Sequence, residues 1–191
     1  MRTIFIAISS ILVLISPIIY ARSILKGETK PHRTTRFVLL LITALSTASL
    51  LAQHNTVAVW LAGVSTLQAV LIFSLSIKHG MGGWSRSDIL CLVIALTGIV
   101  AWQTTKDPAF GLYFSILADF AGMVPALIKT YRLPHTKNVW FFGFDMVAGM
   151  FTLLAIMTFT AEQIAYPIYI MIINAVMVVL ILRPKFSRLT N

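Results

Sequence analysis

Apolar stretches of about 20 residues recur along the whole chain, and each is long enough to cross ~30 Å of hydrocarbon as a helix. Seven of them can be placed, at about residues 3–21, 36–53, 57–77, 87–104, 109–130, 139–160 and 164–182. Divided among seven spans, the 191 residues leave only short connections. The pattern predicts an all-α integral membrane protein with seven transmembrane helices, and no soluble domain fits between them.

The composition agrees with this interpretation. Hydrophobic residues make up 58% of the chain and charged residues only 11%, whereas soluble domains carry about 25% charged residues. The mean hydropathy is +0.89. The single cysteine, Cys91, lies inside an apolar stretch, so no disulfide framework is possible and the redox compartment stays open.

Basic residues outside the spans indicate an orientation. The formal net charge is +9, and two basic residues, Arg2 and Lys106, fall on one side. The other side receives Arg22, Lys26, Lys30, Arg33, Arg36, Lys78, Arg86, Lys129, Arg132, Lys137, Arg183, Lys185 and Arg188. Because cytoplasmic loops are enriched in Lys and Arg, the N-terminus is predicted to face outward and the C-terminus the cytoplasm. This orientation accounts for the positive net charge, so we expect no nucleic-acid partner. The lipid bilayer is the expected surrounding.

Two parts of the sequence match each other. The Pro-His pairs at 31–32 and 134–135 and the Leu-Leu-Ala triplets at 50–52 and 153–155 are both 103 residues apart. Pro17 and Pro125 are 108 apart, and Gln68-Ala69-Val70 aligns with Asn174-Ala175-Val176 at an offset of 106. The matches predict an internal repeat of three helices.

The repeat divides the chain into a first three-helix unit at 1–78, a linker helix at 79–105, a second three-helix unit at 106–183 and a cytoplasmic tail at 184–191. Because three is odd, a single linker helix returns the second unit to the orientation of the first. The two units are therefore predicted to be parallel, related by an axis along the membrane normal.

These features resemble the PQ-loop/SWEET superfamily in its seven-helix form. The resemblance rests on Pro17 and Pro125, a basic Pro-containing loop after the first helix of each unit, and the amides Gln68 and Asn174 in the third helices. The sequence lacks the Pro-Gln dipeptide, since Pro17 precedes Ile18 and Pro125 precedes Ala126, so the subfamily stays open. The resemblance implies a carrier with its solute site between the units, and Asn174 matches the asparagine of SWEET carriers better than Gln68 does. The segment 118–129 also looks like bacterial relatives, which favours a bacterial-type plasma membrane, with an organellar membrane as the alternative.

Two carboxylates lie within the apolar stretches. Asp119 is predicted at mid-depth of the fifth helix, and Asp145 lies closer to the cytoplasmic side in the sixth. Ionisable groups cost at least ~2.5 kcal/mol inside hydrocarbon and usually have a function there, so both are candidates for proton coupling and solute binding. The alternative is an ion pair with Lys129 or Arg132 that only joins helices.

Other polar and small residues complete the candidate site. Gln68 and Asn174 are predicted to line a solute site, or to form interhelical hydrogen bonds. Pro17 and Pro125 are candidate hinges, because proline removes a backbone hydrogen bond. Gly122 and Gly149 are expected to permit close packing. Residues near predicted helix ends are read as interfacial anchors, namely Trp60, Trp140, Tyr113, Tyr166 and Tyr169.

The predicted function is transport of a small polar solute, sugar-like or amino-acid-like, by alternating access and with possible coupling to protons. A membrane receptor or sorting protein on the same fold is the alternative. A retinal protein would need a Schiff-base lysine between Ile164 and Leu182, and none is present. No H-E-x-x-H, G-x-S-x-G or Gly-rich phosphate loop occurs, so we expect no enzyme, cofactor or metal site.

Overall fold

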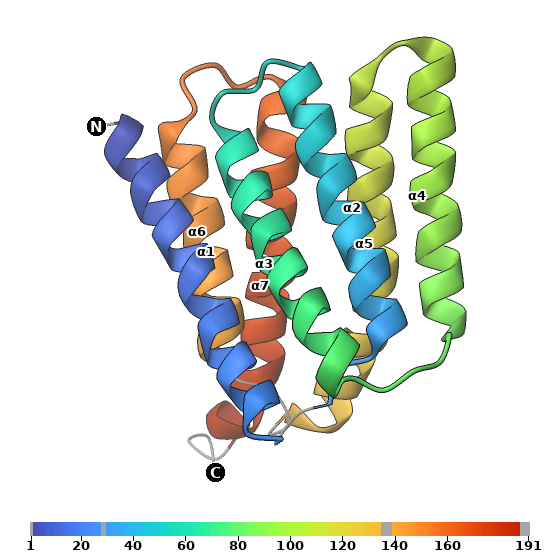
Figure 1. The fold of residues 1–191 in the computed structure, drawn as a ribbon. Helices are drawn as coiled ribbons and strands as arrows, with labels where there is room; N and C mark the ends of the chain where they lie inside the picture. Colours follow the sequence, from blue (N-terminus) through green and yellow to red (C-terminus); the bar gives the residue numbers. More distant parts are fainter. Residues whose placement is uncertain (1, 28–29, 135–138, 188–191) are drawn as a thin grey trace.

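The computed structural model describes residues 2–27, 30–134 and 139–187, and within them the chain forms seven helices (Figure 1). They are α1 (Arg2–Leu25), α2 (Arg33–Ala52), α3 (Ala58–His79), α4 (Arg86–Thr105), α5 (Pro108–Arg132), α6 (Val139–Ala155) and α7 (Ala161–Ser187). Six are long and apolar enough to cross a membrane, and α6 is a shorter apolar helix of 17 residues. The structure therefore fits a multi-pass membrane protein, as the apolar stretches predict.

The sixth helix is five residues shorter than predicted. It ends at Ala155, where the Ile156 N–H donates to the Leu153 carbonyl. The next helix then begins three residues earlier than predicted, because the Thr160 carbonyl accepts hydrogen bonds from the Gln163 and Ile164 N–H groups. The segment 156–160 is still apolar in part, so hydropathy alone could not separate the two helices.

Polar residues at the connections fix where several helices start. Ser85 and Asp88 form a reciprocal capping box at the start of α4, and Asp107 accepts from the Ala109 N–H at the start of α5. The side chain of Asn55 accepts hydrogen bonds from the Val57 and Ala58 N–H groups at the start of α3. Each cap satisfies backbone donors that the first turn of a helix leaves unpaired.

The helices pack in a pattern that is nearly symmetric. Helix α3 packs against both α1 and α2, and α7 packs against both α5 and α6. We call α1, α2 and α3 the first helix set and α5, α6 and α7 the second. Between the two sets, α1 packs against α6, α2 against α5, and α3 against α7. Exchanging α1, α2 and α3 with α5, α6 and α7 preserves these contacts, apart from a small α3–α6 contact. Helix α4 lies outside, against α5 and α2 (Figure 1).

Buried hydroxyl pairs join the two sets at similar depths. The hydroxyl oxygen of Ser9 in α1 lies 2.8 Å from that of Thr152 in α6. The hydroxyl oxygen of Ser115 in α5 likewise lies 2.8 Å from that of Ser46 in α2. Ser9 follows the first residue of α1 by seven positions, and Ser115 follows the first residue of α5 by the same number. In each case the short polar side chains allow two helices to approach closely while their hydroxyl groups stay paired.

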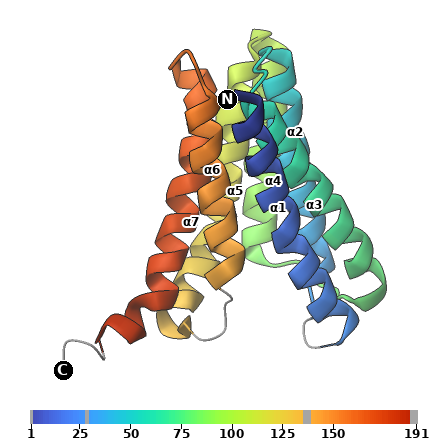
Figure 2. The same cartoon turned by 90° about the vertical axis from the view of Figure 1, so that its left-hand side faces the viewer.

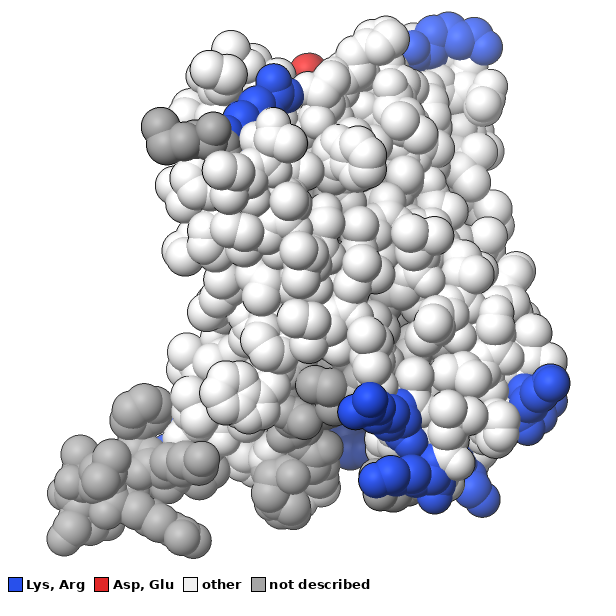
Figure 3. Space-filling view, turned by 60° about the vertical axis from the view of Figure 1, so that its left-hand side comes forward, with Lys and Arg blue, Asp and Glu red and all other residues white. Residues whose placement is uncertain are grey.

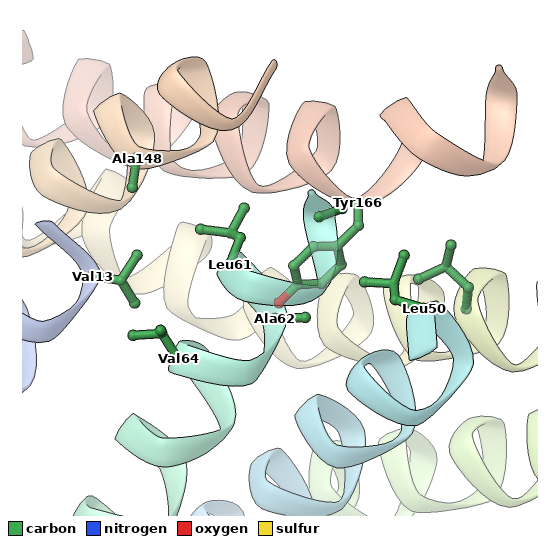
Figure 4. Close-up of a cluster of buried hydrophobic side chains, with 9 residues drawn as sticks. Val13, Leu50, Leu61, Ala62, Val64, Ala148 and Tyr166 are labelled. Atoms are coloured by element: carbon green, nitrogen blue, oxygen red, sulfur yellow. The ribbon is translucent and has the colours of Figure 1, made fainter. Parts of the chain in front are cut away.

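The largest apolar cluster lies toward the end of the molecule that holds the N-terminus. It contains Val13, Leu50, Ala58, Leu61, Ala62, Val64, Leu112, Ala148 and Tyr166, so it draws on all helices except α4. Tyr166 of α7 lies beside Leu61 and Ala62 of α3 (Figure 4). Seen from the side, the two helix sets lie closer together at this end than at the other (Figure 2). Apolar packing therefore joins the two sets in the half of the bundle nearer the N-terminus.

Glycines permit close helix contacts, as predicted for two of them. A methyl group on Gly122 of α5 would lie 3.2 Å from the Cys91 sulfur of α4. One on Gly149 of α6 would lie 3.1 Å from the Met171 nitrogen of α7. At Gly98 of α4 a methyl group would overlap the Cβ of Phe114 on α5.

The basic residues gather at the end opposite the N-terminus, with few at the N-terminal end (Figure 3). This end carries the connections that follow α1, α3 and α5, as the charge distribution predicts. We expect it to face the cytoplasm.

Cysteine labelling tests this orientation. Thr105→Cys, in the exposed last turn of α4, should react with a membrane-impermeant maleimide in intact cells. Gly82→Cys, between α3 and α4, should react only after the cells are permeabilised. The native Cys91 is 3% exposed and gives the background. Labelling of the Gly82→Cys variant from outside would reverse the assignment.

Candidate functional site

The carboxylate of Asp119 is held by a tyrosine. Asp119 lies eleven residues into α5 and is half-buried. The Tyr169 hydroxyl of α7 donates a hydrogen bond to Asp119 Oδ2. Its observed partner is therefore a neutral hydroxyl group from another helix, and not the Lys129 or Arg132 that the ion-pair alternative names.

A second tyrosine of α7 is buried in the bundle. Tyr166 is 4% exposed and belongs to the apolar cluster that contains Leu61 and Ala62 of α3. The expectation that Tyr166 and Tyr169 are interfacial anchors is wrong. Helix α7 begins at Ala161, so both residues are about one turn deeper than predicted, and both face the interior.

The spacing of α7 contains the signal that would have located these tyrosines. Tyr166, Ile173, Asn174 and Met177 are all buried. Their separations of seven, eight and eleven residues place them on one helix face. Tyr169 stands three residues after Tyr166 and adjoins that face. Proximity to a helix end suggested an anchor, whereas periodicity would have indicated an interior position.

By residue count along its helix, Asp145 lies at a depth similar to that of Asp119. It is half-buried on α6, ten residues before the helix ends at Ala155. Gln68 stands ten residues after the start of α3. At 1.5 Å per residue, Asp119 and Gln68 lie ~15–17 Å from the first residues of α5 and α3, and Asp145 lies ~15 Å from the last residue of α6. By this count, three of the four predicted binding residues lie at a similar depth near the middle of the bundle, and we call this depth the polar level.

The two amides differ in their surroundings. Asn174 is 6% exposed and its amide nitrogen donates to the Ile170 carbonyl one turn earlier in α7, at 2.8 Å. This bond lies within one helix, so it does not join helices as the packing alternative requires. Gln68 is half-buried on α3, which packs against α7. Asn174 lies ~20 Å from the first residue of α7, whereas Gln68 lies ~15 Å from the first residue of α3, so Asn174 is slightly deeper along its helix.

The two prolines are not in equivalent environments. Helices α1 and α5 continue through Pro17 and Pro125, but Pro17 is buried and Pro125 is exposed. Each proline removes one backbone hydrogen bond, so each helix can bend at that residue. The hinge role stays a prediction.

A ring contact between Tyr20 and Phe141 joins the two sets beyond the polar level. Tyr20 of α1 accepts a hydrogen bond of 2.9 Å from Arg36 of α2, and its ring centroid lies 6.4 Å from that of Phe141 in α6. Within the second set, the guanidinium carbon of Arg183 in α7 lies 4.1 Å from the ring centroid of Tyr131 in α5.

Within the described part of the chain, His, Cys, Asp and Glu form no group of three that could hold a metal ion. His32 lies in this part, whereas His135 falls outside the described residues.

Comparison of the chain with protein-family models, curated protein sequences and solved structures gives no match. The functional conclusion therefore depends on the residues and their arrangement.

Proposed function

We propose that the protein is a membrane transporter that carries a small polar solute by alternating access. The observation that carries this proposal is the polar level at mid-depth. Asp119 of α5, Asp145 of α6, Tyr169 of α7 and Gln68 of α3 come from both helix sets. Ionisable side chains at this depth cost free energy inside a bilayer, so a bundle with only a structural role would not need them. Transporters place their substrate and ion sites near the bilayer midplane.

The packing pattern supports two units that move against each other. We interpret 1–78 and 106–183 as parallel three-helix repeats, with 79–105 as the linker helix. The symmetric contacts α1–α6 and α2–α5, each with a buried hydroxyl pair, are what such a repeat would produce. Rocking of two repeats about a midplane site is a common mechanism of alternating access.

The shape supports a particular conformation of such a carrier. Between the polar level and the N-terminal end lies the apolar cluster around Leu61, Ala62 and Tyr166. Toward the basic end the two sets lie further apart (Figure 2). With the predicted orientation, this arrangement corresponds to a carrier closed on the outside.

The chemistry of the two carboxylates supports coupling of transport to protons. A carboxylate that alternates between an apolar and a wet environment changes its proton affinity, because burial disfavours the charged form. Asp119 can bind a proton when the site is closed and release it when the site opens, and Tyr169 supplies a hydrogen bond to the charged form.

Solute counterflow tests the proposal. A thermal-shift screen of purified protein against sugars, amino acids, nucleosides and polyamines should find a solute that raises Tm, because a ligand specific for the folded state stabilises it. Liposomes preloaded with that solute should then take up labelled solute through the wild-type protein and not through protein-free membranes. Saturable binding without counterflow would instead indicate the receptor alternative.

A further inference from the structure

A second polar site lies at the N-terminal end, apart from the mid-depth level. A cavity of about 190 Å³ opens there between the two helix sets. It is lined by Arg2, Asn55, Thr56, Val57, Met157, Thr158 and Gln163. Since one water occupies ~30 Å³ in the liquid, the space suits a ligand of several non-hydrogen atoms.

The lining contains a cation and several hydrogen-bond donors but no acidic residue. The Arg2 guanidinium donates to the Thr56 hydroxyl. The Thr158 hydroxyl donates to Gln163 Oε1 at 2.8 Å, which leaves the amide N–H groups of Gln163 for another acceptor. Glu162 precedes Gln163 in the chain, but it is exposed and is not among the lining residues. The electrostatics of the cavity therefore favour an anion.

Asn55 gives an independent indication of a missing acceptor. It is 5% exposed, and its Oδ1 already accepts from the Val57 and Ala58 N–H groups. Within the part of the chain that the structure describes, its amide nitrogen is buried without a partner, as are both amide atoms of nearby Gln53. A buried donor left unpaired costs ~1–3 kcal/mol. An acceptor bound beside Asn55 would remove part of this cost.

Two helix N-termini adjoin the same cavity. Helix α3 starts at Ala58, directly after the lining residue Val57, and α7 starts at Ala161, two residues before Gln163. The N-terminus of a helix carries a partial positive charge of about half an elementary charge and attracts anions.

We propose that this cavity binds one small oxyanion, either a carboxylate or a phosphate group. Arg2 provides the charge, and Asn55 and Gln163 provide neutral donors. Because Arg2 and Asn55 belong to the first helix set and Gln163 to the second, the bound anion holds the two sets together at this end. If the protein is the carrier proposed above, occupancy favours the state closed on the outside. The binding itself does not depend on transport.

Thermal unfolding of the full-length protein in phospholipid-free detergent tests the site. Acetate or inorganic phosphate, added at constant low chloride, should raise Tm in a saturable manner by about 2 °C or more, whereas acetamide should not. Arg2→Gln should abolish the rise. Lys106→Gln removes the other basic residue at this end, lies outside the cavity lining, and should retain it. Gln163→Met should weaken the response at a position away from the chain end.

A second arm distinguishes a soluble anion from a lipid headgroup. Phosphatidylglycerol is added to the same detergent samples in place of acetate, with phosphatidylcholine as the uncharged comparison. Stabilisation by phosphatidylglycerol that Arg2→Gln removes would support the site and identify a lipid phosphate as its occupant. If acetate, phosphate and phosphatidylglycerol all leave Tm unchanged, or raise it equally in Arg2→Gln, the proposal is overturned. Loss of counterflow with an intact anion response would reject only the transport function.

Discussion

Replacement of Asp119 by asparagine should abolish uptake driven by a pH gradient while solute counterflow continues. Asparagine has nearly the shape of aspartate and its oxygen can still accept the hydrogen bond from Tyr169. What it cannot do is bind and release a proton. In proteoliposomes with an imposed pH gradient, we expect the initial rate of driven uptake to fall at least ~10-fold, which corresponds to ~1.4 kcal/mol.

The matched control for this variant is Asp107→Asn. Asp107 caps the start of α5 and lies outside the membrane-spanning region, and asparagine caps helices about as well as aspartate does. One variant loses a carboxylate inside α5 and the other loses the carboxylate that caps it, so only the position differs. If Asp119→Asn retains pH-driven uptake at the wild-type rate, coupling through this residue is wrong. Asp145→Asn then tests the second carboxylate in the same assay.

The positions of the helices could be read from the sequence because a bilayer imposes a simple requirement. Each span must be apolar over about 20 residues and must pair its backbone groups internally, so hydropathy reports both features. The exception is the break between α6 and α7. There the chain stays partly apolar through Met157 and Phe159, and the hydrogen bonds to the Thr160 carbonyl decide where α7 begins.

The candidate site could be predicted only in part. Asp119, Asp145 and Gln68 stand out against an apolar background, and their depth follows from counting residues along a helix. The role of Tyr169 could not be found in this way, because a tyrosine near a helix end is common at a membrane interface. Its hydrogen bond to Asp119 depends on the packing of α5 against α7, which are separated by about 50 residues of chain.

Replacement of Gly98 by alanine should strongly destabilise the packing of α4 on the bundle. The added methyl group would overlap the Cβ of Phe114 and lie 3.2 Å from its Cγ. The Cβ atom is fixed to the backbone of α5, so a rotamer change of Phe114 cannot relieve the overlap. Overpacking of this kind costs ~1–3 kcal/mol, and more where the backbone must shift. We expect Tm of the purified protein to fall by at least ~4 °C.

Gly143→Ala provides the control for Gly98→Ala within the same bundle. Gly143 lies inside α6, and a methyl group added there meets no atom within 4 Å. Alanine is also a better helix former than glycine by ~1 kcal/mol, so this variant should be as stable as the wild type or slightly more so. Equal losses in the two variants would mean that helix glycines matter for a reason other than contact. A loss confined to Gly98→Ala would locate the close approach between α4 and α5.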